Sequence, residues 1–290
     1  MTLRELQALF YGQLNPMYEA DELPKVWRWW MCERLNCAPL QLSQSMNDGL
    51  SVHQIHQLEA DLVRFSSGEP LQYILGNTEF FSLKFKCSSS ALIPRPETEE
   101  LVHWILEENN THDCHFLDIG TGTGCIPLAI KHHRPSWSIA ALDCSEEALS
   151  LARENASLNS LECQWINYDL LNGNGHFPFN QPFHIVASNP PYIPLRDKAA
   201  MSNRVKDFEP NIALFVPDED PLIFYRTILN FCTQFGAPEV AVYFEIHENF
   251  SFEVVELLKS KDFANIEIRK DLQGKERMVR AQRVSLSCES

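Results

Sequence analysis

The first 75 residues place apolar side chains at helical spacing. Apolar positions recur every three or four residues over 3–14, over 26–35 and again over 51–65. Gly68 follows the last of these runs as a helix stop signal. The pattern predicts a small helical-bundle domain over residues 1–75.

The spacing changes to alternation between residues 76 and 92. Phe81, Leu83 and Phe85 are separated by polar or charged residues, which is typical of a half-buried strand. We therefore expect a β-hairpin linker over 76–92.

From residue 93 onward, short strand-like apolar runs alternate with longer runs at helical spacing. This alternation predicts a mainly parallel sheet with helices on both faces. The last two runs, 264–269 and 277–281, flank a turn at Gln273-Gly274 and predict a closing antiparallel hairpin. The expected fold class is α/β, and the α/β domain should cover 93–290.

The composition is that of a soluble globular protein with room for two domains. The chain has 290 residues, of which 44% are hydrophobic and 22% are charged. The first residues contain no basic stretch followed by an apolar core, so we expect no signal peptide, and no apolar run approaches the ~20 residues of a membrane span. The nine cysteines are scattered and include no Cys-x-x-Cys pair, which favours reduced thiols. We expect a cytoplasmic protein that does not bind a membrane.

The net charge of −15 bears on the choice of partner. Proteins that bind nucleic acid usually carry a basic surface, because neutralising phosphates supplies most of their affinity. We therefore expect no direct nucleic-acid binding. The acidic charge could attract a basic protein surface, or it could simply keep the protein in solution.

Two pairs of histidines raise the question of a metal site. His53 and His56 are three residues apart, and His132 is adjacent to His133. Neither pair has an acidic or thiol partner at suitable spacing, so surface histidines on helices are expected instead of metal ligands.

A glycine-rich turn follows an apolar strand that ends at Asp118. Glycine permits positive φ and lets the backbone approach a ligand closely, and the helix that follows offers free N–H groups. The spacing differs from the Gly-x-Gly-x-x-Gly of dinucleotide-binding folds, and no cationic cluster follows to neutralise a pyrophosphate. A smaller zwitterionic ligand fits better, such as the methionine end of S-adenosylmethionine. The turn consists of Gly120, Thr121, Gly122, Thr123 and Gly124.

Acidic residues end the next two predicted strands. Asp143 closes the run 137–143 and could accept hydrogen bonds from ribose hydroxyls. It could equally be an acid that favours the N-terminus of the following helix. Asp169 could accept from an adenine amino group and Leu170 could cover the adenine face, although an Asp before a turn often makes only local hydrogen bonds.

Asn189, Pro190, Pro191 and Tyr192 follow a buried strand over 185–187. The prolines cannot donate to a sheet ladder and stiffen the turn, at the strand end where α/β sheets bind ligands. The Asn189 amide and the Pro190 carbonyl supply acceptors, and Tyr192 supplies an aromatic face. The set suits a planar substrate with an NH₂ group, although the string could also be only a stiffened loop.

Taken together, these motifs resemble those of the release-factor glutamine N5-methyltransferases, the HemK/PrmC family. The resemblance rests on Asp118-x-Gly120-x-Gly122-x-Gly124, Asp143 and Asn189-Pro190-Pro191-Tyr192. It continues in 69–76, which is similar to the interdomain signature, and in 92–99, which is similar to the start of the catalytic domain. Two places depart from the pattern. Cys125 follows the last motif glycine, and 247–249 replace a glycine and a glutamine.

The resemblance implies a Rossmann-like, seven-stranded methyltransferase domain behind a helical substrate-docking domain. The implied reaction transfers a methyl group from S-adenosyl-L-methionine to a glutamine side-chain nitrogen. The glutamine would be that of the Gly-Gly-Gln motif in peptide chain release factors, the proteins of translation termination. The products would be N5-methylglutamine and S-adenosyl-L-homocysteine, formed by a monomer without a metal ion.

The resemblance also assigns roles to residues. Asn189, Pro190 and Tyr192 would be catalytic, Pro191 would join them in binding the substrate, and Phe80 would point toward the cofactor pocket. The cofactor would be bound by Gly120, Thr121, Gly122, Thr123, Gly124, Asp143 and Asn189, together with Asp118, Asp169 and Leu170.

Other functions are compatible with the same motifs. A ribosomal-protein glutamine methyltransferase would use identical chemistry. An adenine N6-methyltransferase could use the same turn, but it would need base flipping and a basic cleft. A non-catalytic cofactor-binding module is a third possibility, which the intact glycine loop and catalytic turn argue against.

Overall fold

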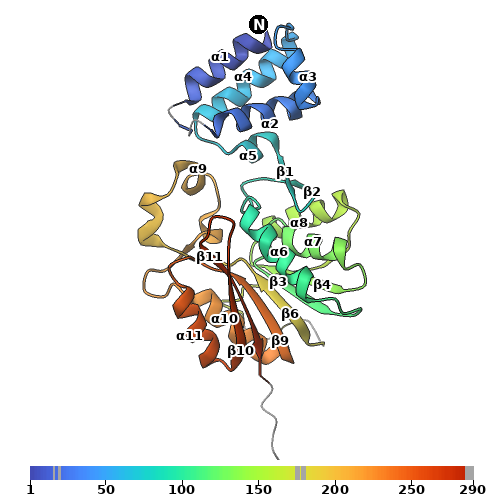
Figure 1. Ribbon diagram of the computed structural model, residues 1–290, viewed down its shortest axis with the longest axis vertical. Helices are drawn as coiled ribbons and strands as arrows, with labels where there is room; N and C mark the ends of the chain where they lie inside the picture. Colours follow the sequence, from blue (N-terminus) through green and yellow to red (C-terminus); the bar gives the residue numbers. More distant parts are fainter. Residues whose placement is uncertain (16, 19–20, 174–176, 178–180, 285–290) are drawn as a thin grey trace, which may run out of the picture. The chain divides into compact units, whose positions relative to one another are not determined.

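The computed structural model describes residues 1–284, except for 16, 19–20, 174–176 and 178–180. The chain forms two compact units, which Figure 1 colours along the sequence. The smaller comprises residues 1–77 and 202–208, and the larger comprises 78–201 and 209–290.

The smaller unit is helical. Its first helices are α1 (Leu3–Leu14), α2 (Leu23–Leu35), α3 (Pro39–Gln44), α4 (Val52–Ser66) and α5 (Leu71–Leu75). Capping boxes begin α1 and α4, where Thr2 and Ser51 satisfy backbone N–H groups. Aromatic rings fill the core, and Phe10 stacks on Trp30 with ring centroids 5.3 Å apart. The apolar side chains at helical spacing form this core, which is why their spacing correctly predicted the helices.

The segment 202–208 joins this unit from far along the chain. Its helix α9 (Asn203–Lys206) carries Arg204, whose Nη1 donates to Glu22 Oε1 at 2.8 Å. The guanidinium also lies 4.0 Å from the ring centroid of Tyr18. The expected α/β domain over 93–290 is therefore interrupted, because this ion pair and cation–π contact hold seven of its residues in the smaller unit.

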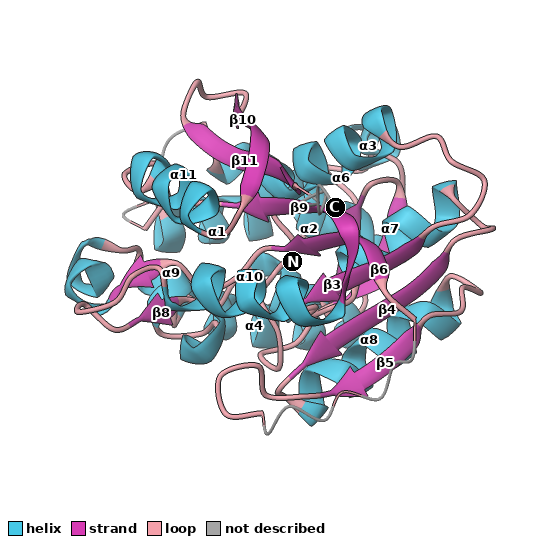
Figure 2. Cartoon of the chain, turned by 90° about the horizontal axis from the view of Figure 1, so that it is seen from below, coloured by secondary structure: helices cyan, strands magenta, loops and turns pink. Residues whose placement is uncertain are grey.

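The described part of the larger unit contains a seven-stranded sheet in the order β10-β11-β9-β6-β3-β4-β5. The strands from β9 to β5 are parallel, and β11 pairs antiparallel with both β9 and β10. Figure 2 shows the parallel strands side by side. The strands are β3 (His115–Ile119), β4 (Ser138–Asp143), β5 (Gln164–Asn167), β6 (Phe183–Ser188), β9 (Gly236–Glu245), β10 (Phe263–Lys270) and β11 (Glu276–Arg283).

Helices cover both faces of this sheet, which confirms the predicted α/β fold. One core lies beneath α6 (Pro96–Glu108) and α7 (Cys125–His133), and α8 (Glu146–Leu158) adds to it. The other lies beneath α10 (Ile223–Phe235) and α11 (Ser251–Ser260), as Figure 1 shows. The predicted closing hairpin is present as β10 and β11. Alternation of strands and helices therefore identified the layers correctly.

A hairpin of β1 (Asn77–Phe80) and β2 (Leu83–Lys86) precedes the sheet. The strand expected from Phe81 begins only at Leu83, because Phe81 and Ser82 form the turn with φ of 48° and 65°. The Asn155 amide bonds both backbone groups of Lys86 and so attaches the hairpin to α8.

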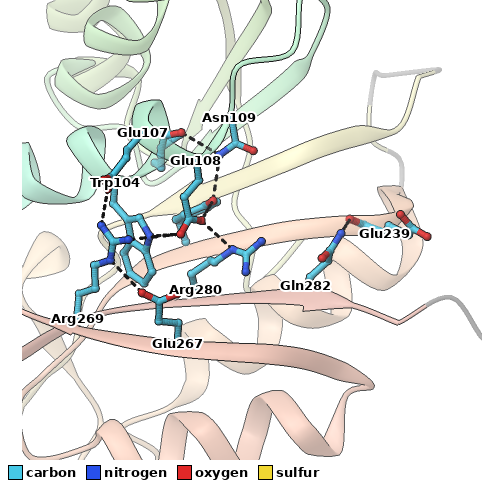
Figure 3. A network of polar contacts seen from close by, with 11 residues as sticks. Trp104, Glu107, Glu108, Asn109, Glu239, Glu267, Arg269, Arg280 and Gln282 are labelled. Carbon is cyan, nitrogen blue, oxygen red and sulfur yellow. Dashed lines mark hydrogen bonds and ion pairs between the residues drawn. The ribbon is translucent and has the colours of Figure 1, made fainter.

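The C-terminal end of α6 is held by a polar network, drawn in Figure 3. Glu108 accepts from the indole of Trp104 at 2.7 Å and from the hydroxyl of Tyr243 at 2.9 Å. Its carboxylate also lies 3.1 Å from Arg280 Nε, and Arg269 pairs with Glu107 at 2.7 Å. The arginines offset the unfavourable position of two acids at the negative end of a helix. This network joins α6 to β9, β10 and β11.

A second, two-stranded sheet follows β6. It pairs β7 (Ile193–Pro194) with β8 (Phe215–Val216), and the 3₁₀ turns η1 (Leu195–Ala200) and η2 (Asn211–Ala213) lie between these strands in sequence. Among the described residues, no helix is both long and apolar enough to cross a membrane. Within the same part of the chain, no three His, Cys, Asp or Glu side chains gather in a metal-binding group.

Candidate active site

The carboxyl ends of the central strands surround a cavity of about 270 Å³ in the larger unit. The chain proceeds from β3 to β4 and β5 on one side, then returns to place β6 on the other side of β3. Such a reversal of strand order is where open α/β sheets bind ligands. The lining residues that bear on chemistry are Arg95, Thr98, Gly120, Thr121, Gly122, Thr123, Asp143, Asp169, Leu170, Asn189, Pro190 and Pro191.

The glycine-rich turn lines one wall of this cavity. Gly120, Gly122 and Gly124 have φ of 75°, 54° and 79°, so each adopts the left-handed conformation that glycine tolerates best. A Cβ on Gly124 would also lie 3.0 Å from the Trp165 ring and 3.2 Å from Ala152 Cβ. Gly124 lies outside the described lining of the cavity, and the absence of a side chain there lets the turn pack against Trp165 and Ala152, whereas Gly120 and Gly122 line the cavity itself.

Asp118 lies at the end of β3 and is fully buried, and it does not belong to the described lining of the cavity. Neither carboxylate oxygen has a hydrogen-bond partner among the described residues, and the same holds for the hydroxyls of Thr121 and Thr123. Burial is the main cause that raises the pKa of Asp118 to about 7; the nearby Thr121 hydroxyl opposes this shift, and the neighbouring Asp143 adds to it. Buried polar atoms normally have a hydrogen-bond partner, so the hydroxyls of Thr121 and Thr123, which line the cavity, are candidate contacts for a polar ligand.

Asp143 ends β4 and lines the cavity. Its Oδ2 accepts from the Gly122 N–H at 2.9 Å, and its Oδ1 accepts from the Ser145 N–H at 3.0 Å. Burial raises the pKa of Asp143, although these backbone donors oppose the shift. Each oxygen retains capacity for a further hydrogen bond, since a carboxylate oxygen has two lone pairs.

Asp169 and Leu170 lie after β5 and also line the cavity. Asp169 accepts from the backbone N–H groups of Leu171 and Asn172, and from the Asn172 side chain. The Asn172 amide is the main cause of its lowered pKa. The local hydrogen bonds expected of an Asp before a turn are therefore present, together with a position at the cavity.

Asn189, Pro190 and Pro191 form the opposite wall. The Asn189 Nδ2 donates to Thr98 Oγ1 at 3.1 Å. The preceding residue, Ser188, is fully buried and donates to the Ile119 carbonyl at 2.6 Å, which ties the turn to the end of β3. Hydrogen bonds to α6 and to β3 therefore hold the turn in place without a substrate.

Tyr192 ends the turn, and a buried acid accepts a hydrogen bond from its hydroxyl. Tyr192 lies outside the described set of lining residues, and its hydroxyl donates to Glu245 Oε1 at 3.0 Å. Burial raises the pKa of Tyr192 well above its usual value. The hydroxyl of Tyr192 thus braces the end of the turn, and the contact of its ring with a substrate amide stays a prediction.

The segment 247–249, which departs from the family pattern, adjoins this tyrosine. The ring centroids of His247 and Tyr192 are 6.0 Å apart, and their planes meet at 74°. The ring of Phe250 lies 5.2 Å from His247 on the same segment. Burial lowers the pKa of His247, which favours the neutral ring in this contact.

Phe80, expected to point toward the cofactor, lies elsewhere. It is 1% exposed, packs against Phe85 at 6.0 Å, and is absent from the described cavity lining. The alternation of the hairpin directs its side chain into the core beneath α6 and α7.

Several site residues were not identified from the sequence. Thr98 and Arg95 line the cavity, and buried Glu209 accepts from Arg95 at 2.5 Å and from the Ile93 N–H at 3.1 Å. Glu245 is 2% exposed and ends β9. An acid at the end of the apolar run 240–246 was the available signal, because a buried carboxylate requires partners.

Known families match both parts of the chain. The family described as PrmC N-terminal domain matches residues 18–76. The family described as Methyltransferase small domain matches residues 98–207.

The chain is also similar to curated proteins and solved structures. It is 41% identical to the release factor glutamine methyltransferase of Flavobacterium psychrophilum, over 78% of this chain and 80% of the relative. It is 34% identical to the enzyme of the same name from Bacteroides thetaiotaomicron, over 97% and 100%. A methyltransferase structure from Pyrococcus furiosus is 13% identical with a TM-score of 0.52, covers 81% of this chain and 100% of its own, and supports the fold alone. The chain belongs to the release factor glutamine methyltransferase family.

Proposed function

We propose that this protein methylates the side-chain amide nitrogen of a glutamine in a protein, using S-adenosyl-L-methionine. The proposed substrate is the Gly-Gly-Gln glutamine of peptide chain release factors, in keeping with the names of the relatives. The main support for the proposal is that a single cavity is lined on one side by residues suited to the cofactor and on the other by residues suited to an amide substrate. The glycine-rich turn and Asp143 form the first side, and the polar turn 189–191 forms the second.

The residues present suit that cofactor. Thr121 and Thr123 line the cavity, their buried hydroxyls have no hydrogen-bond partner within 3.5 Å in the described chain, and these oxygens favour a ligand with an ammonium group. Asp143 would accept from ribose hydroxyls through its remaining lone pairs. Asp169 and Leu170 would contact the adenine. When bound, S-adenosyl-L-methionine supplies a methyl group already activated by its sulfonium charge.

The task left to the protein is to position the glutamine. Its amide nitrogen is a weak nucleophile, because the lone pair is delocalised into the carbonyl. The Asn189 Oδ1 and the Pro190 carbonyl would accept hydrogen bonds from the two amide protons. Correct alignment of reactants can contribute roughly 7–11 kcal/mol to lowering a barrier. The same carbonyl dipoles would stabilise the positive charge that develops on nitrogen.

Methyl transfer to three candidate substrates tests this proposal. The enzyme is incubated with methyl-labelled cofactor and a purified release factor, a ribosomal protein or DNA, and the modified residue is mapped by mass spectrometry. We expect label on the Gly-Gly-Gln glutamine of the release factor, and none on a matched release factor in which that glutamine is replaced by glutamate. Label only on the ribosomal protein or on adenine would contradict the proposal.

The proposal also covers the state of the enzyme. We expect a cytoplasmic monomer that turns over without a metal ion. Light scattering of the purified chain and turnover after treatment with a chelator check these two points.

A further inference from the structure

Two buried residues lie directly behind the catalytic turn. Thr98 occupies the first turn of α6 and Glu245 ends β9, and each is 2% exposed. The Thr98 hydroxyl donates to Glu245 Oε2 at 2.7 Å. Asn189 donates from its Nδ2 to the same hydroxyl oxygen at 3.1 Å. A chain of hydrogen bonds therefore runs from Glu245 through Thr98 to Asn189.

The direction of this chain follows from the chemistry of its members. An ionised carboxylate can only accept hydrogen bonds, so the single hydroxyl proton of Thr98 is committed to Glu245. The Thr98 oxygen can then only accept from Asn189, which requires the NH₂ end of the amide. The carbonyl end, Oδ1, must point away from Thr98.

The second oxygen of Glu245 acts on the same turn. Tyr192 donates its hydroxyl proton to Oε1 at 3.0 Å. Both ends of the turn 189–192 are thus held by one carboxylate. Its backbone is fixed in turn, because the Tyr225 hydroxyl donates to the Glu245 carbonyl at 3.0 Å.

We propose that Glu245 and Thr98 are positioning residues that keep the Asn189 Oδ1 available as the acceptor for the substrate amide. The proposal rests on the proposed function, since it assigns that oxygen to the glutamine NH₂ group. A free asparagine amide could rotate by 180° and present its NH₂ instead, which would repel the substrate's own donors. The relay excludes that orientation.

The surroundings keep Glu245 suited to this task. Burial raises the pKa of its carboxyl, while the hydrogen bonds from Thr98 and Tyr192 and the charge of Arg277 oppose that shift. Arg277 is itself held by Asp271 at 3.3 Å. The acid therefore has the donors that a buried carboxylate requires.

Glu245→Gln is the most informative change, because it alters polarity with little change in shape. A glutamine can donate to Thr98, which frees the hydroxyl proton for the Asn189 carbonyl and turns the NH₂ toward the cavity. We expect the kcat for methyl transfer to fall roughly 10- to 100-fold, less than the roughly 10²- to 10³-fold loss typical of deleting a preorganised contact, because Asn189 itself remains. Cofactor affinity by calorimetry should change less than about twofold.

Threonine 98 provides the conservative rescue. Thr98→Val removes both hydrogen bonds and should lower kcat as Glu245→Gln does, whereas Thr98→Ser retains the hydroxyl and should stay within about threefold of wild type. Thr227→Val is the matched control and should keep the wild-type kcat, because it removes a partly buried threonine hydroxyl that bonds the Ile223 carbonyl within α10 and is not part of the relay. Equal losses for Thr98→Ser and Thr98→Val would overturn the proposal, and so would a wild-type kcat for Glu245→Gln.

Hydrogen exchange of the Asn189 side chain, measured without any substrate, tests the relay independently of the proposed methyl transfer. In ¹⁵N NMR of the full chain, the Asn189 side-chain NH₂, assigned with Asn189→Ser, should be protected from hydrogen exchange by Thr98. In Glu245→Gln it should face the cavity and exchange at least about tenfold faster, since a buried hydrogen bond is lost. Unchanged protection would refute the relay even if methyl transfer to glutamine is confirmed. Faster exchange would support it even if another substrate is found.

Discussion

Asn189 is the residue on which the proposed chemistry depends most directly. Asn189→Ala removes the acceptor while the prolines keep the turn in shape. We expect kcat to fall roughly 10²- to 10³-fold, the usual loss for one preorganised polar contact. Cofactor affinity should fall much less, because the glycine loop and Asp143 remain. Steady-state kinetics and calorimetry measure the two quantities, and the exposed Asn110→Ala serves as control. Near-normal turnover of Asn189→Ala would contradict the assigned role.

Asp118 should make stability depend on pH in an unusual sense. Burial raises the pKa of this acid to about 7 in the folded protein, whereas an unfolded Asp titrates near its ordinary value of about 3.9. Between these values the folded state binds the proton more tightly, so the contribution of Asp118 to stability is lost as pH rises from about 4 to 7.

Asp118→Asn tests that dependence. The variant carries no ionisable group at this position, so its free energy of unfolding should increase relative to wild type as pH rises from about 4 to 7 and then stay level. Urea unfolding at several pH values measures the difference, with exposed Asp113→Asn as the control. Parallel curves for Asp118→Asn and wild type would show that the carboxyl is not perturbed as described.

For single residues, the sequence was a better guide to the motifs that line the cavity than to the side chains that support Asn189. Residues 120–123 and Asn189 line the cavity and stand in recognisable motifs, because a ligand-binding turn requires particular residue types at fixed spacing. Thr98 and Glu245 are 147 residues apart, and only the folded sheet brings their side chains within 2.7 Å. Nothing in the local spacing of either residue reports that contact.

Helices and strands were predicted most accurately where one periodicity persisted over a whole segment. The strand end at Asp143 and the final hairpin followed from this rule. The first hairpin was predicted less well, because Phe81 looks like a strand residue but adopts positive φ in the turn. A bulky aromatic residue rarely takes that conformation, so its sequence gave no warning.

Helix α6 offers a test at the scale of elements. Glu108 accepts two buried or partly buried hydrogen bonds and pairs with Arg280 at the helix end. We expect Glu108→Ala to lower the free energy of unfolding by about 2 kcal/mol, because the indole and the tyrosine hydroxyl lose their acceptor. Urea unfolding gives this value.

Glu107→Ala is the matched control on the same turn. Its side chain is 55% exposed and pairs with Arg269 only at the surface, so its loss should cost less than about 1 kcal/mol. Equal effects of the two substitutions would mean that the network in Figure 3 does not anchor the helix as described.

For the whole molecule, the chief departure from expectation is the path of the chain. Residues 202–208 belong to the smaller unit, so the chain passes between the units after residues 77, 201 and 208. Apolar periodicity could not reveal this, because the segment is short and its contacts are few: Arg204 pairs with Glu22 and lies over Tyr18, and the Phe208 ring lies beside Gly68. Such isolated contacts leave no repeating pattern in the sequence.

Arg204→Met should loosen this segment. The ion pair with Glu22 and the contact with Tyr18 are partly exposed, so we expect a loss of about 1 kcal/mol, confined to the smaller unit. Hydrogen exchange followed by mass spectrometry should show faster exchange in α9 and unchanged exchange in β3 and β4. Exposed Arg28→Met provides the control. Slow exchange of α9 in Arg204→Met would mean that other contacts hold it.

The bond from Thr98 to Glu245 has a consequence for protein engineering. The Asn-Pro-Pro-Tyr motif cannot be transferred to another protein on its own. The orientation of its asparagine amide depends on a hydroxyl from a helix and a carboxylate from a strand, both elsewhere in the chain. If these four residues were grafted onto the sheet of another protein, the asparagine would be transferred without the hydrogen bonds that orient its amide. The graft would also need the threonine and the glutamate, because only then would the asparagine present its carbonyl oxygen to a substrate NH₂ group.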